Sequence, residues 1–187
     1  QALPEGAEAF AADDTHALTP VDYGDVCLNA DTRWFAAKGL AVARTLDDLA
    51  RPEYAGLLVV ENPASSSPGL AFLAATVGAK GDSGYLDYWK ALKANGVKVV
   101  KGWTEAYTVE FSGSSGKGDR PLVVSYASSP AYEPATEALT STCFRQVEYA
   151  GVLAGAQNEV GARKFVDFLL SAAVQAEIPE SMYMSPV

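Results

Sequence analysis

The sequence predicts an α/β domain whose sheet is at least partly parallel, with helices on both faces. Short apolar runs typical of strands alternate along the chain with segments of helical periodicity. One run, residues 56–60, is continuously apolar, as expected of a strand covered on both faces. It leads through a polar loop directly into an apolar helical segment, residues 70–79, which makes half of a β–α–β unit.

The rest of the chain continues this alternation. Residues 1–20 are rich in Ala, Asp, Glu and Pro without a period, and we predict a loose or partly helical lead-in there. Further strands are expected at residues 22–29, 97–100, 122–126 and 143–153, further helices at 83–94, 103–111 and 158–176, and a flexible turn at 112–118.

Two of the predicted helices have specific features. Thr45 is expected to cap a short helix whose first turn is acidic. The last helix is predicted to be amphipathic, with one side formed by Phe165, Phe168, Leu169 and Ala172.

The charge balance argues against nucleic acid as a partner. The chain has 14 Lys and Arg residues and 23 Asp and Glu residues, which gives a formal charge of −9. A negative charge of this size repels the phosphate backbone of nucleic acids. The longest apolar runs, residues 70–77 and 165–174, are far shorter than the ~20 residues of a spanning helix. The start of the chain has neither the basic region nor the apolar region of a signal peptide, so we expect a mature or trimmed form.

Metal and cofactor chemistry have little support in the composition. Cys27 and Cys143 are too few and too far apart for a zinc knuckle, and the single histidine, His16, lies in the polar lead-in. We therefore expect no metal site and no cofactor. The two cysteines lie in β-like runs, and they suit either buried free thiols in a cytosolic protein or a disulfide in an exported one.

The loops after Val60, Val100 and Val124 are the candidate binding positions, because ligands of open α/β sheets bind at the carboxyl ends of strands. The first loop places three serines before a helix start, where free N–H groups can hold an anion, although a serine N-cap alone explains the same pattern. The other two bring a tryptophan, tyrosines and further serines. This combination suits a flat, partly cationic ligand with an anionic tail.

An enzyme would need a nucleophile with a base, a metal, or paired carboxylates. The sequence has no Gly-x-Ser-x-Gly elbow and no P-loop. Only a hydrolase that uses Ser66 and Lys101 stays open as an alternative, so we predict a binding protein and not an enzyme.

Six segments resemble, in order, those of the thiamine-binding proteins of ABC importers, within the type II periplasmic solute-binding family. They are Pro20-Val-Asp-Tyr-Gly24, Ser65-Ser-Ser-Pro-Gly-Leu70, Lys101-Gly-Trp-Thr-Glu-Ala-Tyr107, Ser125-Tyr-Ala-Ser-Ser-Pro-Ala-Tyr132, Gln146-Val-Glu148, and Ile178-Pro followed by Pro186-Val187. The third and fourth are the specific ones, because a Ser-x-Pro-Gly loop also occurs in other binding proteins of the superfamily.

The resemblance implies a monomeric protein outside the cytoplasm, in the periplasm or at the cell surface on a lipid anchor, that delivers thiamine or its phosphates to an ABC permease. Ser66 and Ser67 would hold the phosphate or hydroxyethyl end. Trp103, Tyr126 and Tyr132 would pack around the rings and the thiazolium charge. Tyr183 would add a further aromatic contact, although the family tends to have tryptophan at this position.

The chain departs from the family pattern at both ends. The family has a whole lobe before the Asp-Tyr-Gly strand and continues past Pro-Val, so residues 21–187 are expected to be mainly the second lobe with its crossover strands. Export implies a disulfide between Cys27 and Cys143. Ferric iron, a polyamine or an oxyanion are the alternative cargoes. A ferric iron site would require a cluster of tyrosine, histidine and carboxylate ligands. The tyrosines here alternate with serines, which argues against iron.

Overall fold

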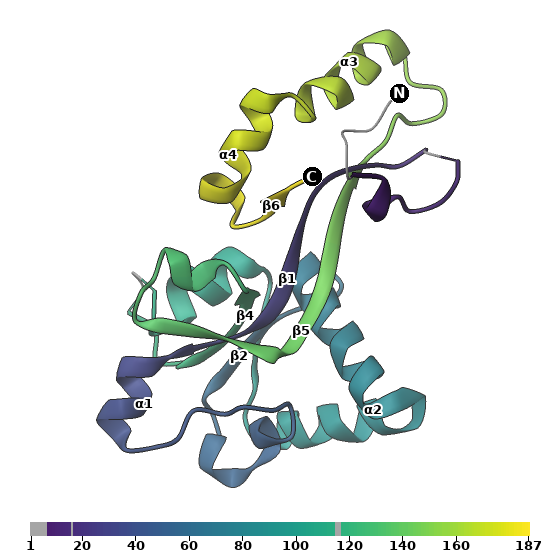
Figure 1. Cartoon of the computed structure of the whole chain (residues 1–187). Helices are drawn as coiled ribbons and strands as arrows, with labels where there is room; N and C mark the ends of the chain where they lie inside the picture. Colours follow the sequence, from purple (N-terminus) through teal and green to yellow (C-terminus); the bar gives the residue numbers. More distant parts are fainter. Residues whose placement is uncertain (1–6, 16, 115–116) are drawn as a thin grey trace. The chain divides into compact units, whose positions relative to one another are not determined.

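The computed structural model describes residues 7–15, 17–114 and 117–187 (Figure 1). The chain forms two compact units: a larger one, Asp25–Gln146, and a smaller one, Gln1–Gly24 with Val147–Val187. The long strands β1 (Thr19–Asp31) and β5 (Thr136–Ala150) contribute to both. Within the described ranges, no helix is long and apolar enough to cross a membrane.

A mixed sheet organises the larger unit, with strand order β3-β2-β4-β1-β5. The strands β2 (Leu58–Glu61), β3 (Lys98–Val100) and β4 (Leu122–Tyr126) are the predicted ones, and β2 pairs in parallel with both neighbours. The long strand β1 then runs antiparallel to β4. The predicted α/β fold with a partly parallel sheet is therefore confirmed.

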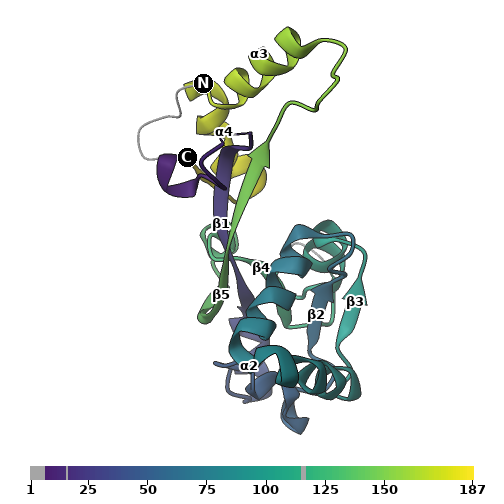
Figure 2. The ribbon, with the colours of Figure 1, turned by 90° about the vertical axis from the view of Figure 1, so that its right-hand side faces the viewer.

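The crossovers of this sheet also follow the prediction. Helix α2 (Ser67–Ala94) packs on β2 and β4 (Figure 2). It contains a non-helical residue, Gly81, with φ 69°, so it consists of two helical pieces, as predicted. The return from β3 to β4 runs through η4 (Glu105–Glu110), a π-helical turn inside the predicted helix 103–111. The right-handed crossover rule places α2 and η4 on opposite faces of the sheet.

A core forms between η4 and the sheet. Its buried members are Val59, Val100, Ala106, Tyr107, Phe111 and Val123, with Trp103 packed against them. The remaining helices of the larger unit are short: α1 (Thr32–Lys38), η2 (Asp48–Ala50), η3 (Pro52–Tyr54) and η5 (Ser129–Ala131). The helix predicted to begin at Thr45 is the 3-10 helix η2, whose N-cap position is Asp47 and not Thr45. The Thr45 hydroxyl nevertheless accepts from the Asp48 N–H at 3.3 Å.

Strand β5 begins seven residues earlier than predicted. Its first half is polar and carries no alternating pattern. The strand is held instead by its neighbour β1, to which it contributes a side chain: the Thr142 hydroxyl accepts from the Leu28 N–H at 3.0 Å. The predicted turn 112–118 includes residues 115–116, which lie outside the described residues, as does His16.

The smaller unit contains η1 (Ala7–Phe10), α3 (Glu159–Leu169), α4 (Ala172–Met182) and β6 (Ser185–Pro186), which pairs antiparallel with β1. The prediction of one helix over 158–176 is wrong. Ser171 adopts an extended conformation and its hydroxyl caps a new helix by accepting from the Val174 N–H at 3.4 Å. The apolar side that carries Phe165 and Phe168 is largely uncovered, because these side chains are 60% and 56% exposed.

Candidate ligand-binding site

The three candidate loops meet at one edge of the larger unit. They follow β2, β3 and β4, which are parallel, so their carboxyl ends share an edge. Direct hydrogen bonds join the first two loops. The Asn62 N–H donates to the Val100 carbonyl at 2.8 Å, and the Ser65 hydroxyl donates to the Lys101 carbonyl at 2.7 Å.

The serine loop begins α2 as predicted. Ser66 is extended and its hydroxyl accepts from the Gly69 N–H at 3.4 Å, which is the geometry of an N-cap. Ser67 is the first helical residue and is exposed. A Cβ on Gly69 would lie 2.5 Å from the Glu61 carbonyl oxygen, so only glycine lets the helix start directly against the end of β2. The loop thus presents hydroxyls and helical N–H groups together.

An aromatic cluster lies beside this loop. The rings of Trp103 and Tyr107 are stacked, with centroids 4.8 Å apart and an interplanar angle of 12°. Tyr126 lies at the end of β4, with its ring centroid 6.3 Å from that of Trp103. Tyr107 was not among the predicted site residues. The spacing of four residues between Trp103 and Tyr107 in a predicted helix is the signal that could have found it.

A short chain of hydroxyls holds the tryptophan. The Trp103 indole N–H donates to the Ser125 hydroxyl at 2.9 Å, and the Ser125 and Ser129 hydroxyls lie 2.8 Å apart. Both serines are fully buried. The Ser129 hydroxyl also accepts from the Tyr126 backbone N–H at 3.3 Å, so one network joins the Trp103 side chain to the backbone at the end of β4. These two serines form the support of the site and were not predicted to act in it.

A cavity of about 330 Å³ opens between the first two loops. Its lining residues are Ser65, Lys101, Gly102, Trp103, Thr104 and Glu105. The Lys101 N–H donates to the Glu105 carboxylate at 3.2 Å. The cavity therefore combines a flat aromatic wall, a hydroxyl and groups of both charges, a lining suited to a small polar aromatic ligand.

The other predicted site residues lie further along the chain. Tyr132 follows η5, is 38% exposed, and donates its backbone N–H to the Ser129 carbonyl at 3.0 Å. Tyr183 belongs to the smaller unit. It ends α4 in the left-handed conformation, with φ 59°. Ser66, Ser67, Trp103 and Tyr126 are thus on neighbouring loops, whereas Tyr183 is on a separate unit.

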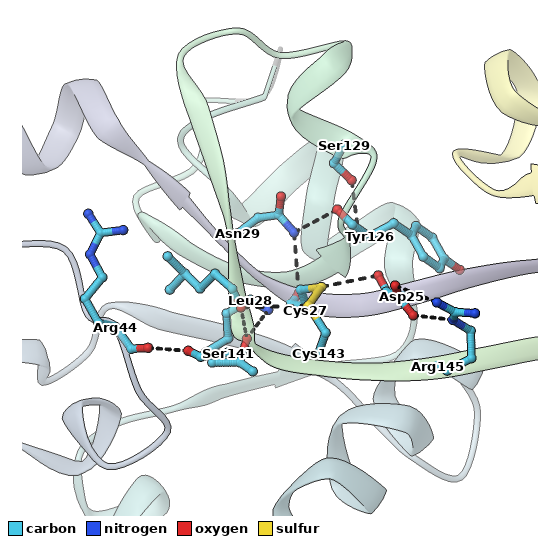
Figure 3. The surroundings of a disulfide bond; sticks show 12 residues. Asp25, Cys27, Leu28, Asn29, Arg44, Tyr126, Ser129, Ser141, Cys143 and Arg145 are labelled. Carbon is cyan, nitrogen blue, oxygen red and sulfur yellow. Dashed lines mark hydrogen bonds and ion pairs between the residues drawn. A yellow bond between two sulfur atoms is a disulfide. The ribbon is translucent and has the colours of Figure 1, made fainter.

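The disulfide implied by the resemblance is present: Cys27 of β1 is bonded to Cys143 of β5 (Figure 3). Polar contacts surround it. The Asn29 amide donates to the Tyr126 carbonyl at 3.1 Å, and Arg145 forms an ion pair with Asp25 (Figure 3). Because Cys27 is directly opposite Ser125 in the β1–β4 register, the bridge braces the strands that carry the hydroxyl network.

Two buried acids have raised pKa values. Burial raises the pKa of Glu61, the last residue of β2, to about 8. In the smaller unit, burial and then the nearby Glu148 raise the pKa of Asp22 to about 7. Neither acid was predicted, since an isolated carboxylate at a strand end has no distinctive sequence pattern.

A family model described as "Bacterial extracellular solute-binding protein" matches residues 2–187. The chain belongs to this family. Two curated relatives of this chain are the thiamine-binding periplasmic proteins of Salmonella typhimurium LT2 (31% identical) and Escherichia coli K12 (32%), each aligned over 178 residues. The alignments cover 91% of this chain and 51% of each relative. The chain therefore spans about half the length of the curated relatives it matches.

Solved structures agree with this family membership. A periplasmic thiamin binding protein matches the chain with a TM-score of 0.78 and 29% identity, over 91% of this chain and 53% of its own. Iron-bound HitA from Pseudomonas aeruginosa has a TM-score of 0.70 at 18% identity, over all of this chain and 62% of its own, and this likeness concerns the fold alone. The predicted family and fold are confirmed.

Proposed function

We propose that this chain is part of the extracytoplasmic solute-binding component of an ABC importer, and that its ligand is thiamine or a thiamine phosphate. The observation that carries the proposal is the arrangement at the shared strand edge. There, the stacked Trp103 and Tyr107 rings lie beside a serine loop that begins a helix. The names of the curated relatives support thiamine as the ligand.

Each part of the ligand has a counterpart among these residues. A cationic thiazolium ring gains both buried area and a cation–π interaction from an aromatic wall. Trp103, Tyr126 and Tyr132 are assigned to the rings, and Tyr183 to a further aromatic contact. The phosphate or hydroxyethyl end is assigned to Ser66 and Ser67, where hydroxyls and helical N–H groups are available. The protein acts by binding, not catalysis, as a monomer that hands its ligand to the permease subunits.

The test is a fluorescence titration of the 187-residue chain with thiamine, its mono- and diphosphate, ferric iron and spermidine. Trp103 is one of three tryptophans, so the signal is assigned with Trp103→Phe and with the matched control Trp34→Phe on α1. We expect thiamine compounds to change the signal, and the change to be lost only in Trp103→Phe.

The expected affinity is low. Because the chain spans about half the length of its relatives, we expect weaker than micromolar binding, and the titration should extend to millimolar ligand. Micromolar or tighter binding would show that the placement of the cleft is wrong. A folded chain that responds to iron or spermidine and not to thiamine would overturn the proposal.

A further inference from the structure

Glu61 is a fully buried acid at the edge where the candidate loops meet. Its exposed fraction is 0%, and neither carboxyl oxygen has a hydrogen-bond partner in another described residue. Its own backbone N–H only partly offsets the effect of burial. Buried carboxyl groups are normally paired because an unpaired one costs stability. The stability cost of burying the unpaired Glu61 carboxyl group points to a role for Glu61 in the candidate binding site.

Strand alternation directs this carboxyl toward the aromatic cluster. Val59, two residues earlier, packs in the core with Tyr107 and Trp103, and residues i and i+2 of a strand share a face. Glu61 pairs with Val100 of the same core. Extending the β2–β4 register by two residues places Glu61 beside Ser125, which accepts from the Trp103 indole. The backbones of these two residues are therefore about one strand spacing, ~4.8 Å, apart, and their side chains share the face that carries the tryptophan.

The other ionisable groups on the elements packed against β2 have defined positions. On β3 and η4, Lys98 pairs with Glu110 at 2.6 Å, and Glu105 accepts from the Lys101 N–H. Tyr107 of η4 and Tyr126 of β4 belong to the aromatic cluster. On α2, across the sheet, Tyr88 is the one buried ionisable side chain within the described residues, and its hydroxyl donates to the Leu46 carbonyl at 2.7 Å. None of these interactions supplies a cation to Glu61.

We infer that Glu61 is a specificity-determining residue of this site, which gives up its proton when a cationic ring occupies the space over Trp103. The inference rests on the proposed function and adds to it a recognition of ligand charge. The proton passes from the carboxyl to solvent, and the carboxylate then balances the charge of the ring.

The burial of Glu61 determines the expected size of the pH dependence of ligand affinity. Burial raises the pKa of Glu61 to about 8, so the group is neutral at pH 7. A unit positive charge held ~6 Å away, at an effective dielectric of about 20, lowers such a pKa by about two units. Affinity for the cation should then rise about twentyfold between pH 6.5 and 8.5, and binding at pH 7 should release most of one proton.

The test is the pH dependence of thiamine binding by the 187-residue chain, followed by tryptophan fluorescence, together with proton release into weakly buffered solution. Glu61→Gln removes the titrating group, and Glu61→Met replaces it with an apolar side chain should the glutamine variant not fold. Glu137→Gln, on an exposed pair with Arg44, is the matched control.

The expected result is an approximately twentyfold tightening of thiamine binding between pH 6.5 and 8.5 in the wild type and in Glu137→Gln, and a flat profile in the Glu61 variants. Thiamine binding that is pH-independent and releases no proton would overturn the inference while the proposed function stands. A pH dependence that survives in the Glu61 variants would assign it to another group and overturn the inference too. No binding at any pH would overturn both.

Discussion

The larger and the smaller unit differ in how completely they bury their apolar side chains. In the larger unit, Val59, Val60 and Val123 of the sheet are completely buried. In the smaller unit, Leu153 and Phe165 are 82% and 60% exposed. A sheet with helices on both faces creates its own core, whereas two short helices and a two-residue strand cover little apolar surface. Because only the larger unit has such a core, we expect it to determine most side-chain positions at the candidate site.

Loss of the disulfide should cause the largest change in stability, and this change should affect the larger unit. The bridge closes a separation of 116 residues within the larger unit, and its removal is expected to cost about 2–5 kcal/mol of unfolding free energy. Chemical denaturation of the oxidised and reduced chain measures this, and the chain has no other cysteine to interfere. Two titratable thiols in the unreduced, denatured protein would contradict the bridge itself.

The buried acids should make the stability of both units depend on pH. The folded pKa of Glu61, about 8, lies above its ordinary value of 4.5, so between these values the folded state holds a proton that the unfolded state has lost. Stability should therefore fall as pH rises through this window, by up to about 1.4 kcal/mol per unit, and level off above pH 8.

Two variants separate the contributions of the units to this slope. Glu61→Gln should flatten the dependence in the window 4.5–8, and Asp22→Asn in the window 3.8–7 that its own pKa defines. Urea unfolding at half-unit pH steps measures both. An unchanged slope in Glu61→Gln would mean that the carboxyl is solvated in the folded protein.

Substitution of the aromatic wall should affect binding more than folding. Trp103→Ala removes a cation–π contact and buried ring area, and we expect thiamine affinity to fall about tenfold, equivalent to ~1.4 kcal/mol. Circular dichroism checks the fold and fluorescence or calorimetry the affinity. Trp34→Ala, on α1 outside the strand edge, is the control, and equal losses in both variants would remove Trp103 from the site.

The smallest effect is expected in the smaller unit. Phe168→Ser on α3 should change the unfolding free energy by no more than about 0.5 kcal/mol, because the side chain is largely exposed. Phe111→Ser, in the buried core of the larger unit, should cost several times more. Thermal unfolding of the two variants measures the ratio. Equal losses would show that the smaller unit buries its phenylalanines in solution.

Local patterns in the sequence determined much of the larger unit. Residues 58–60 of the predicted run 56–60 form the buried strand β2, because a run of leucine and β-branched residues suits a strand covered on both sides. The serine loop starts a helix where predicted, since a hydroxyl before proline is a strong local N-cap signal. Parallel strands then bring their terminal loops together, so the positions of Ser66 and Trp103 at one edge followed from the order of elements.

Only the tertiary structure decided which side chains support that edge. Ser125 orients the Trp103 ring because β4 lies next to β2. Glu61 is fully buried, and within the described residues its carboxyl oxygens have no hydrogen-bond partner. The polar first half of β5 became a strand through its pairing with β1. These features depend on residues far apart in the chain. Helical periodicity placed Phe165 and Phe168 on one apolar side of a helix, but it did not determine whether anything covers that side, and both are largely exposed.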